Sequence, residues 1–139
     1  MFTTKVEAVI KAPIEKVYSY VRNLETMVEY NSSLKHAKWT DSEKNSCAIT
    51  LSLSIVNINS DYRIISEEKG KSFLASCDST TLKFDDYYEF EDRGENTFLR
   101  ITDNIELKGL LRLSEGILSG IFRKEMQENM DRLVRNLEK

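Results

Sequence analysis

The sequence predicts one α+β domain in which a curved antiparallel sheet of seven strands wraps around a long C-terminal helix. The sheet and the helix are expected to enclose a cavity. Three observations support this fold class. Apolar and polar residues alternate through most of the chain from Leu34 to Leu107, as in strands with one buried face. The links between these strands are too short for parallel crossovers, which need about a dozen residues or more. The last segment, Ser114 to Leu137, has apolar residues at helical spacing.

The N-terminal part is predicted to form one strand and two short helices. Thr4 to Lys11 alternates in the manner of a strand. Ala12-Pro13 follows, and proline is favoured at the first position of a helix because its missing N–H would be unpaired there anyway. Apolar residues at i, i+3, i+4 and i+7 then predict a helix from Ile14 to Val21. A second helical piece, Leu24 to Tyr30, ends at the turn cluster Asn31 to Ser33.

Six further strands are predicted as a meander. The clearest runs from Cys47 to Asn57, where the alternation is most regular. Turn-forming residues are expected to separate the strands at Asn57 to Asp61, Glu68 to Lys71, Asp78 to Thr80 and Asp92 to Asn96.

The C-terminal helix is predicted to begin at Ser114, whose hydroxyl would cap it, and to present two apolar faces. One stripe consists of Phe122, Met126, Met130, Leu133 and Leu137, and a second, rotated by about 100°, consists of Leu110, Leu111, Ile117, Leu118 and Ile121. The apolar face changes from one stripe to the other near Phe122. Either the helix is kinked or broken there, or its C-terminal half anchors on the sheet while its N-terminal half closes a cavity or contacts a partner.

Composition and charge exclude several classes of function. The net charge is -3 and the basic residues form no block, so no nucleic-acid partner is expected. The single histidine, His36, cannot form a multi-histidine site, and no glycine-rich phosphate loop is present, so we expect neither a metal nor a cofactor. Cys47 and Cys77 lie in apolar strand patterns and are expected to be buried free thiols.

The hydropathy pattern favours a cytoplasmic protein. Met1 to Lys11 alternates and carries charges, whereas a signal peptide needs an unbroken apolar run. No segment approaches the roughly 20 apolar residues of a membrane span, so no stable membrane insertion is expected.

Two aspartates stand at positions that are otherwise apolar. Asp86 is in phase with Phe84 and Tyr88, and Asp103 is in phase with Ile101. A carboxylate facing an apolar cavity is unfavourable unless it is paired, hydrogen-bonded or protonated. If both face inward from neighbouring strands, they can orient a polar ligand group or act as acid and base.

Other arrangements of these aspartates remain open. A bulge near Asp85 would turn the first carboxylate outward, and an arginine such as Arg63 or Arg123 would neutralise the pair. Aromatic residues are further candidates for a pocket lining, because they combine an apolar body with a polar tip. These residues are Tyr30, Tyr62, Tyr88 and Trp39.

Four segments carry a resemblance to a known family. Ile10 to Tyr18 (IKAPIEKVY) resembles the strand-to-helix signature that opens bacterial polyketide cyclase/dehydratase proteins. Glu29 to Lys35 (EYNSSLK) resembles their Trp-Asn-Pro-hydrophobic-Lys turn, with Tyr in place of Trp and Ser in place of Pro. Tyr88 to Glu91 and Met130 to Glu138 also fit. The chain therefore resembles this branch of the START and birch-pollen-allergen-like (SRPBCC) superfamily, whose fold is called helix-grip.

The resemblance implies a long apolar pocket between the sheet and the terminal helix, holding lipids, sterols, quinones, hormones or polyketides. The main hypothesis is therefore binding or transport of a small hydrophobic ligand in an internal cavity. One alternative is a polyketide cyclase/dehydratase-type enzyme, although no catalytic cluster is evident. Another is a protein partner or homodimer bound through the apolar face from Leu110 to Ile121. The candidate ligand-binding residues are Met27, Tyr30, Leu51, Leu53, Phe73, Phe84, Asp86, Tyr88, Ile101, Asp103, Ile117 and Ile121.

Overall fold

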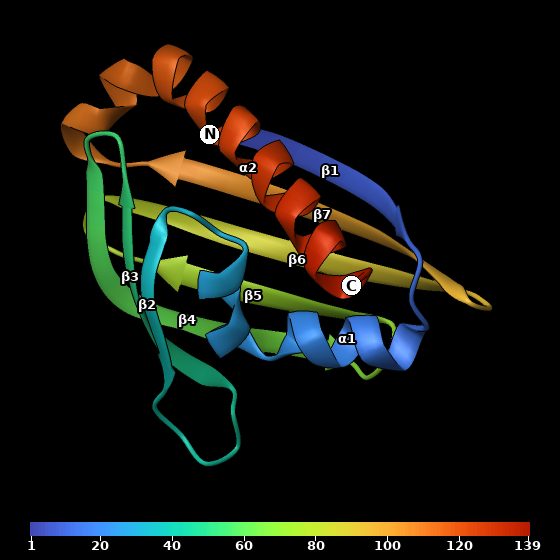
Figure 1. Ribbon diagram of the computed structural model, residues 1–139. Coiled ribbons are helices and arrows are strands. Elements are labelled where there is room, and N and C mark those ends of the chain that lie inside the picture. The colour runs from blue at the N-terminus through green and yellow to red at the C-terminus, as the bar shows by residue number, and fades with distance from the viewer.

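The computed structural model describes residues 1–139 and confirms the predicted helix-grip architecture (Figure 1). One antiparallel sheet of seven strands, in the order β1-β7-β6-β5-β4-β3-β2, curves around a long helix. The strands are β1 Phe2–Ile10, β2 Leu34–Trp39, β3 Ser46–Leu53, β4 Val56–Glu68, β5 Ser72–Asp78, β6 Leu82–Arg93 and β7 Asn96–Leu107. The helices are α1 Ile14–Arg22, the 3₁₀ helices η1 Leu24–Glu29 and η2 Gly109–Ser114, and α2 Glu115–Leu137.

The connection after β1 carries the chain from one edge of the sheet to the other. β1 pairs with β7 at one edge, whereas β2 forms the other edge, so the chain must cross the sheet between them. α1 and η1 make this crossing. α1 buries Val17, Tyr18 and Val21, the stripe predicted from their helical spacing. The remaining strands follow one another as a meander, as predicted.

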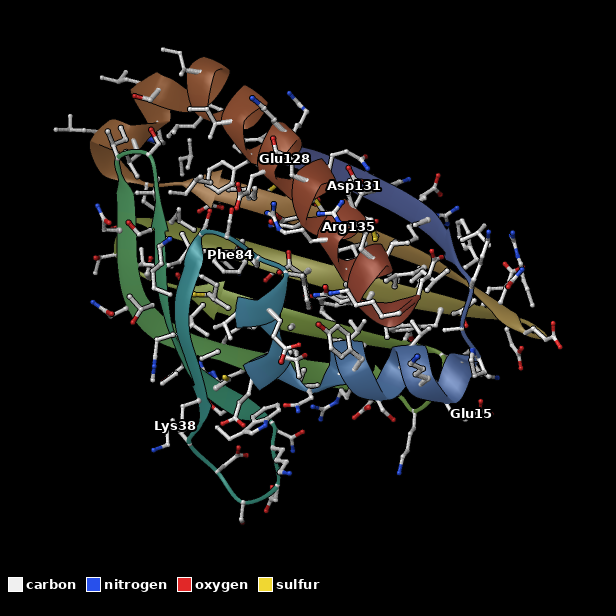
Figure 2. The ribbon with its side chains drawn as sticks, in the orientation of Figure 1. Glu15, Lys38, Phe84, Glu128, Asp131 and Arg135 are labelled. Atoms are coloured by element: carbon white, nitrogen blue, oxygen red, sulfur yellow. The ribbon has the colours of Figure 1, made fainter.

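α2 lies over the concave face of the sheet and is anchored by its C-terminal half (Figure 1). Met130, Leu133 and Leu137 are buried. The outer face of the same half is charged and carries Glu128, Asp131 and Arg135, as Figure 2 shows. No helix of the chain is both long enough and apolar enough to span a membrane.

The N-terminal half of α2 differs from the prediction. The helix is continuous from Glu115 to Leu137, so of the alternatives expected near Phe122 a break into two helices is wrong. Two residues of the second stripe, Leu110 and Leu111, belong instead to η2, a separate 3₁₀ segment. Ser114 occupies the N-cap position, but its hydroxyl makes no capping hydrogen bond. Of the second stripe only Leu118 is fully buried, whereas Leu110 and Ile117 are exposed.

The predicted turn at Asn57 to Asp61 is also wrong. The chain reverses at Ser54 and Ile55, with Ser54 at a positive φ of 55°, and β4 then continues through the asparagines. Their side chains lie on the outer face and bond across to β3. The Ser52 hydroxyl donates to Asn57 at 2.6 Å, and the Thr50 hydroxyl donates to Asn59 at 2.7 Å. These cross-strand bonds make asparagine compatible with a strand that buries its other face.

Candidate functional site

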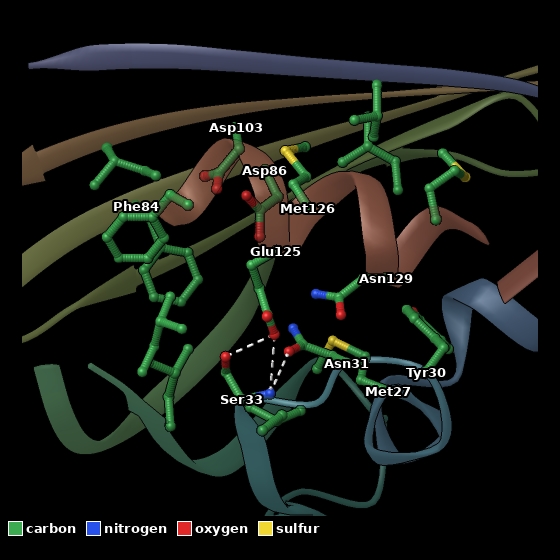
Figure 3. A pocket seen from close by; sticks show the side chains of 18 of the residues that line it. Met27, Tyr30, Asn31, Ser33, Phe84, Asp86, Asp103, Glu125, Met126 and Asn129 are labelled. Atoms are coloured by element: carbon green, nitrogen blue, oxygen red, sulfur yellow. Dashed lines mark hydrogen bonds between the residues drawn. The ribbon is translucent and has the colours of Figure 1, made fainter. Parts of the chain in front are cut away.

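A cavity of about 120 Å³ lies between the concave face of the sheet and α2 (Figure 3). Of the 23 residues that line it, 17 are hydrophobic. β1, η1, β2, β3, β4, β6, β7 and the inner face of α2 all contribute to the lining. The polar side chains gather at two places, a carboxyl pair on the sheet and a cluster between α2 and the turn after η1.

The carboxyl pair consists of Asp86 and Asp103, which face each other directly across β6 and β7. The β6–β7 register runs without a bulge through both residues, so both side chains lie on the cavity face with Phe84 and Tyr88. Figure 3 shows the two carboxyl groups side by side next to Met126 of α2. Asp86 is buried, whereas Asp103 is partly exposed as a residue although its Oδ1 is shielded from solvent.

Two tyrosine hydroxyl groups form a hydrogen-bonded chain that ends on this pair. The Tyr62 hydroxyl donates to Asp86 Oδ2 at 2.5 Å, and the hydroxyl groups of Tyr62 and Tyr88 are 2.9 Å apart. Because the Tyr62 hydrogen is used for Asp86, Tyr88 is the donor in the second bond. Ala75 lies beside Asp86 on β5 in the pairing register, and its small side chain leaves room for the longer Tyr62 to reach the carboxylate.

Burial and proximity force the two carboxyl groups to share a proton. Removal from water raises the pKa of Asp86, and hydrogen bonds from Asp103 and Tyr62 counteract part of this effect. Removal from water, the charge of Asp86 and the hydrogen bond between the carboxyl groups raise the pKa of Asp103 well above its usual range. Asp103, whose pKa is raised further, is therefore the carboxyl group on which the pair keeps its proton. Asp86 Oδ1 and Asp103 Oδ1 have no other hydrogen-bond partner.

The second polar cluster ties α2 to the turn between η1 and β2. Glu125 Oε1 accepts hydrogen bonds from the Ser32 hydroxyl at 2.7 Å and from the Ser33 hydroxyl and backbone N–H at 2.7 and 3.1 Å (Figure 3). Two turns further along α2, the Arg132 guanidinium donates to the Tyr30 carbonyl oxygen at 2.8 Å. Burial opposes the charge of Glu125, but these serine hydrogen bonds outweigh it and hold its pKa below the usual value. The cluster therefore closes one wall of the cavity.

Most predicted binding residues meet in this cavity. Those that line it are Met27, Tyr30, Leu51, Leu53, Phe84, Asp86, Tyr88, Ile101 and Asp103. Tyr30 is buried and its hydroxyl group has no hydrogen-bond partner. Tyr62, proposed as an aromatic lining residue, also faces the cavity.

Three predicted binding residues lie elsewhere. Phe73 is buried in the core under α1, with its ring stacked on Tyr88 at 4.3 Å and edge-on to Tyr18 at 6.1 Å. Ile117 is 74% exposed, and Ile121 packs against the core without reaching the cavity. Strand alternation gives the face that a side chain occupies but not its distance from the cavity along that face.

The other side chains considered from the sequence lie outside the cavity. Trp39 does not line the cavity, because its indole N–H donates to Asn23 and its ring lies under Arg22. Arg63 and Arg123 are exposed and make no ion pair with the aspartates, so the expected alternative of arginine neutralisation is wrong. His36 is exposed. Cys47 and Cys77 are buried free thiols, as predicted, and burial raises the pKa of each to about 11.

The sequence interpretation missed the contribution of α2 and of the turn before β2. Glu125 and Asn129 line the cavity, but the apolar stripes predicted for the C-terminal helix included neither residue. Asn31 and Ser33 were read only as turn formers. A signal was present, because Glu125 and Asn129 are spaced by four residues and lie on the same face as Phe122 and Met126.

Sequence and structural comparisons agree with this geometry. The family described as polyketide cyclase / dehydrase and lipid transport matches residues 1–138. The chain belongs to this family. No curated protein sequence matches it. The family is part of the SRPBCC superfamily that the N-terminal motifs indicated.

Solved structures share the fold of this family member at low sequence identity. An aromatase/cyclase from a Streptomyces species is 6% identical with a TM-score of 0.83, over 99% of this chain and 93% of that one. A START superfamily protein from Mycobacterium smegmatis is 13% identical with a TM-score of 0.72, over 98% and 94%. A Thermus thermophilus protein is 20% identical with a TM-score of 0.73, over 99% and 94%. These likenesses confirm the helix-grip fold.

The shared proton predicts an unusual pH dependence of stability. In the unfolded chain Asp103 ionises near pH 3.9, whereas in the folded protein its raised pKa keeps it protonated to higher pH. The folded state therefore binds more protons above that pH, and stability falls as pH rises toward the folded pKa. Asparagine does not ionise, so the Asp103→Asn variant avoids this loss of stability at high pH. Its side-chain amide can still donate a hydrogen bond to Asp86. We expect the variant to be more stable than the wild type at pH 8, by about 1–3 kcal/mol, with the difference vanishing near pH 4.

Urea unfolding followed by circular dichroism over this pH range measures the effect. The control is Glu106→Gln, which makes the same carboxyl-to-amide change at an exposed position on β7. A constant difference between Asp103→Asn and wild type at every pH, or a wild type more stable at pH 8, would show that Asp103 is not protonated in the folded state.

Proposed function

We propose that this family member binds a small, mostly apolar molecule carrying one polar group in the cavity under α2. The observation that supports the proposal best is a cavity with a mostly apolar lining that contains a buried carboxyl pair with unpartnered oxygens. Buried polar atoms nearly always have hydrogen-bond partners. Asp86 Oδ1, Asp103 Oδ1 and the Tyr30 hydroxyl therefore suit the polar group of a ligand, while the apolar walls suit its body.

The size of the cavity limits the ligand. An engineered cavity of about 150 Å³ in another protein holds one benzene molecule, so a free volume of about 120 Å³ corresponds to roughly one ring. Typical ligand pockets measure about 300–1,000 Å³. A lipid, quinone or polyketide-like ligand would therefore have to displace part of the wall. η2 and the part of α2 before Phe122 bury little apolar surface, but no residue of either segment lines the cavity.

Native mass spectrometry of the purified protein, followed by identification of any released compound, tests this function. We expect a co-purified apolar molecule, and we expect Ile101→Trp to lose it because the larger side chain fills the cavity. Val9→Trp is the control, since Val9 lies on β1 outside the cavity and is 48% exposed. Equal occupancy in both variants would place the bound molecule outside the cavity, and a protein without any bound compound would oppose tight binding.

The carboxyl pair also favours a second candidate function, acid–base catalysis on the bound molecule. Asp103, whose raised pKa favours the protonated form, lies beside Asp86, so the pair offers a donor and an acceptor on one side of the cavity. A cyclase or dehydratase requires both groups. Asp103→Asn would then abolish turnover, whereas a carrier would keep its ligand.

A third candidate is association through the exposed apolar face of Leu110, Leu113 and Ile117. These side chains are 86%, 87% and 74% exposed and come from η2 and the start of α2. A second copy of the chain is the simplest partner. In that case the wild type sediments as a dimer and Leu113→Ser/Ile117→Ser sediments as a monomer; a wild type that is monomeric at high concentration contradicts self-association.

A further inference from the structure

The cavity has acidic side chains but no basic ones. Asp86, Asp103 and Glu125 all line it, whereas no Lys, Arg or His side chain does. None of the three carboxylates takes part in an ion pair of the protein. Glu125 has three hydrogen bonds from Ser32 and Ser33, so its charge is compensated locally. The carboxyl pair has much less compensation.

The donors available to the carboxyl pair reach only one of its sides. The chain from Tyr88 through Tyr62 ends on Asp86 Oδ2. The other hydrogen bond of the pair links the two carboxyl groups to each other. Thr4 lies opposite Asp103 on β1, but its hydroxyl donates to the Met126 sulfur instead. Neither Asp86 Oδ1 nor Asp103 Oδ1 accepts a hydrogen bond from any other residue. The carboxyl pair therefore lies in a mostly apolar space without a basic counter-charge and with acceptor oxygens unused.

A second polar group in the cavity is also unpartnered. Tyr30 is 6% exposed, and its hydroxyl group lines the cavity without a partner in the protein. It comes from the end of η1, on a different element from the aspartates, so it is an independent indication of a ligand with hydrogen-bonding groups. A buried charge without a partner is strongly unfavourable, and an opposite charge on a ligand removes this penalty.

We infer that the ligand is a small aromatic or aliphatic amine, whose protonated nitrogen donates to the Asp86 and Asp103 carboxyl groups while its apolar body lies among the hydrophobic walls. This inference rests on the proposed binding function and narrows it. It excludes carboxylic acids, including fatty acids, because a second anion in the cavity would be repelled by the carboxyl pair at close range. Neutral alcohols of the same shape should bind with intermediate strength, because they supply a hydrogen bond but no charge.

Three molecules with one ring and different charge provide the test: benzylamine, benzyl alcohol and benzoate, each titrated into the wild-type protein by isothermal calorimetry at pH 7. Hydrogen bonds to charged groups are stronger than neutral ones, so we expect benzylamine to bind about 10-fold or more tightly than benzyl alcohol. We expect benzoate to bind more weakly than benzyl alcohol.

The double variant Asp86→Asn/Asp103→Asn tests whether the carboxyl pair sets this order of affinities. The double variant should bind benzylamine no more tightly than benzyl alcohol, because the ammonium group then enters the cavity without the carboxyl pair that would compensate its charge. Glu106→Gln, which removes a surface charge on β7, should keep the wild-type order. If the double variant does not fold, the order measured with the wild type still decides between an amine and an anion.

The outcomes separate this inference from the proposed function. Binding of benzyl alcohol or benzoate in preference to benzylamine would overturn the inference that the ligand is an amine, while it would support an apolar binding cavity. Preference for benzylamine that persists in the double variant would also overturn it, since the nitrogen would then bind elsewhere. No binding of any of the three probes would count against both the cavity function and the amine.

Discussion

Two carboxyl groups that face each other across adjacent strands impose the main constraint on this structure. Asp86 and Asp103 cannot both ionise in an apolar space, so one proton must remain between them. The surrounding residues follow from that requirement. Tyr62 and Tyr88 supply donors on one side, and Ala75 leaves the space through which Tyr62 reaches the pair. Apolar residues at these two positions would give a simpler core, so the fold by itself does not require the aspartates.

The same helix that covers this pair divides into a fixed half and a loosely held half. From Met126 onward α2 is held by buried apolar side chains and by the hydrogen bonds of Glu125 and Arg132 to the turn after η1. Before that point, Leu118 is its main buried anchor, and Ile117 faces solvent. The residues of α2 that line the cavity lie between Phe122 and Leu133, so a molecule larger than the free volume would have to shift the part of the helix that is held.

The fold could be predicted from sequence because it depends on periodicity, whereas the site depends on distances that periodicity does not contain. Alternation placed Asp86 and Asp103 on the buried face, and the β6–β7 register then set them opposite each other. The same reasoning misplaced Phe73, which has the correct face but lies under α1. It also misread Asn57 to Asp61, because asparagine in a strand is stabilised by cross-strand partners that local composition does not reveal. Glu125 was missed because its serine partners lie about ninety residues away in the chain.

The protonation state of the carboxyl pair can be measured directly. In protein with carbon-13 label at the aspartate side chains, the carboxyl resonances of Asp86 and Asp103 can be followed by NMR as a function of pH. We predict two coupled titration steps, with one proton retained at pH values where aspartate is normally ionised. Asp103→Asn should leave a single step. If both aspartates instead ionise independently near pH 4, the usual range for exposed aspartate, the carboxyl groups do not share a proton, and the cavity is not the water-excluding site on which the proposed binding function depends.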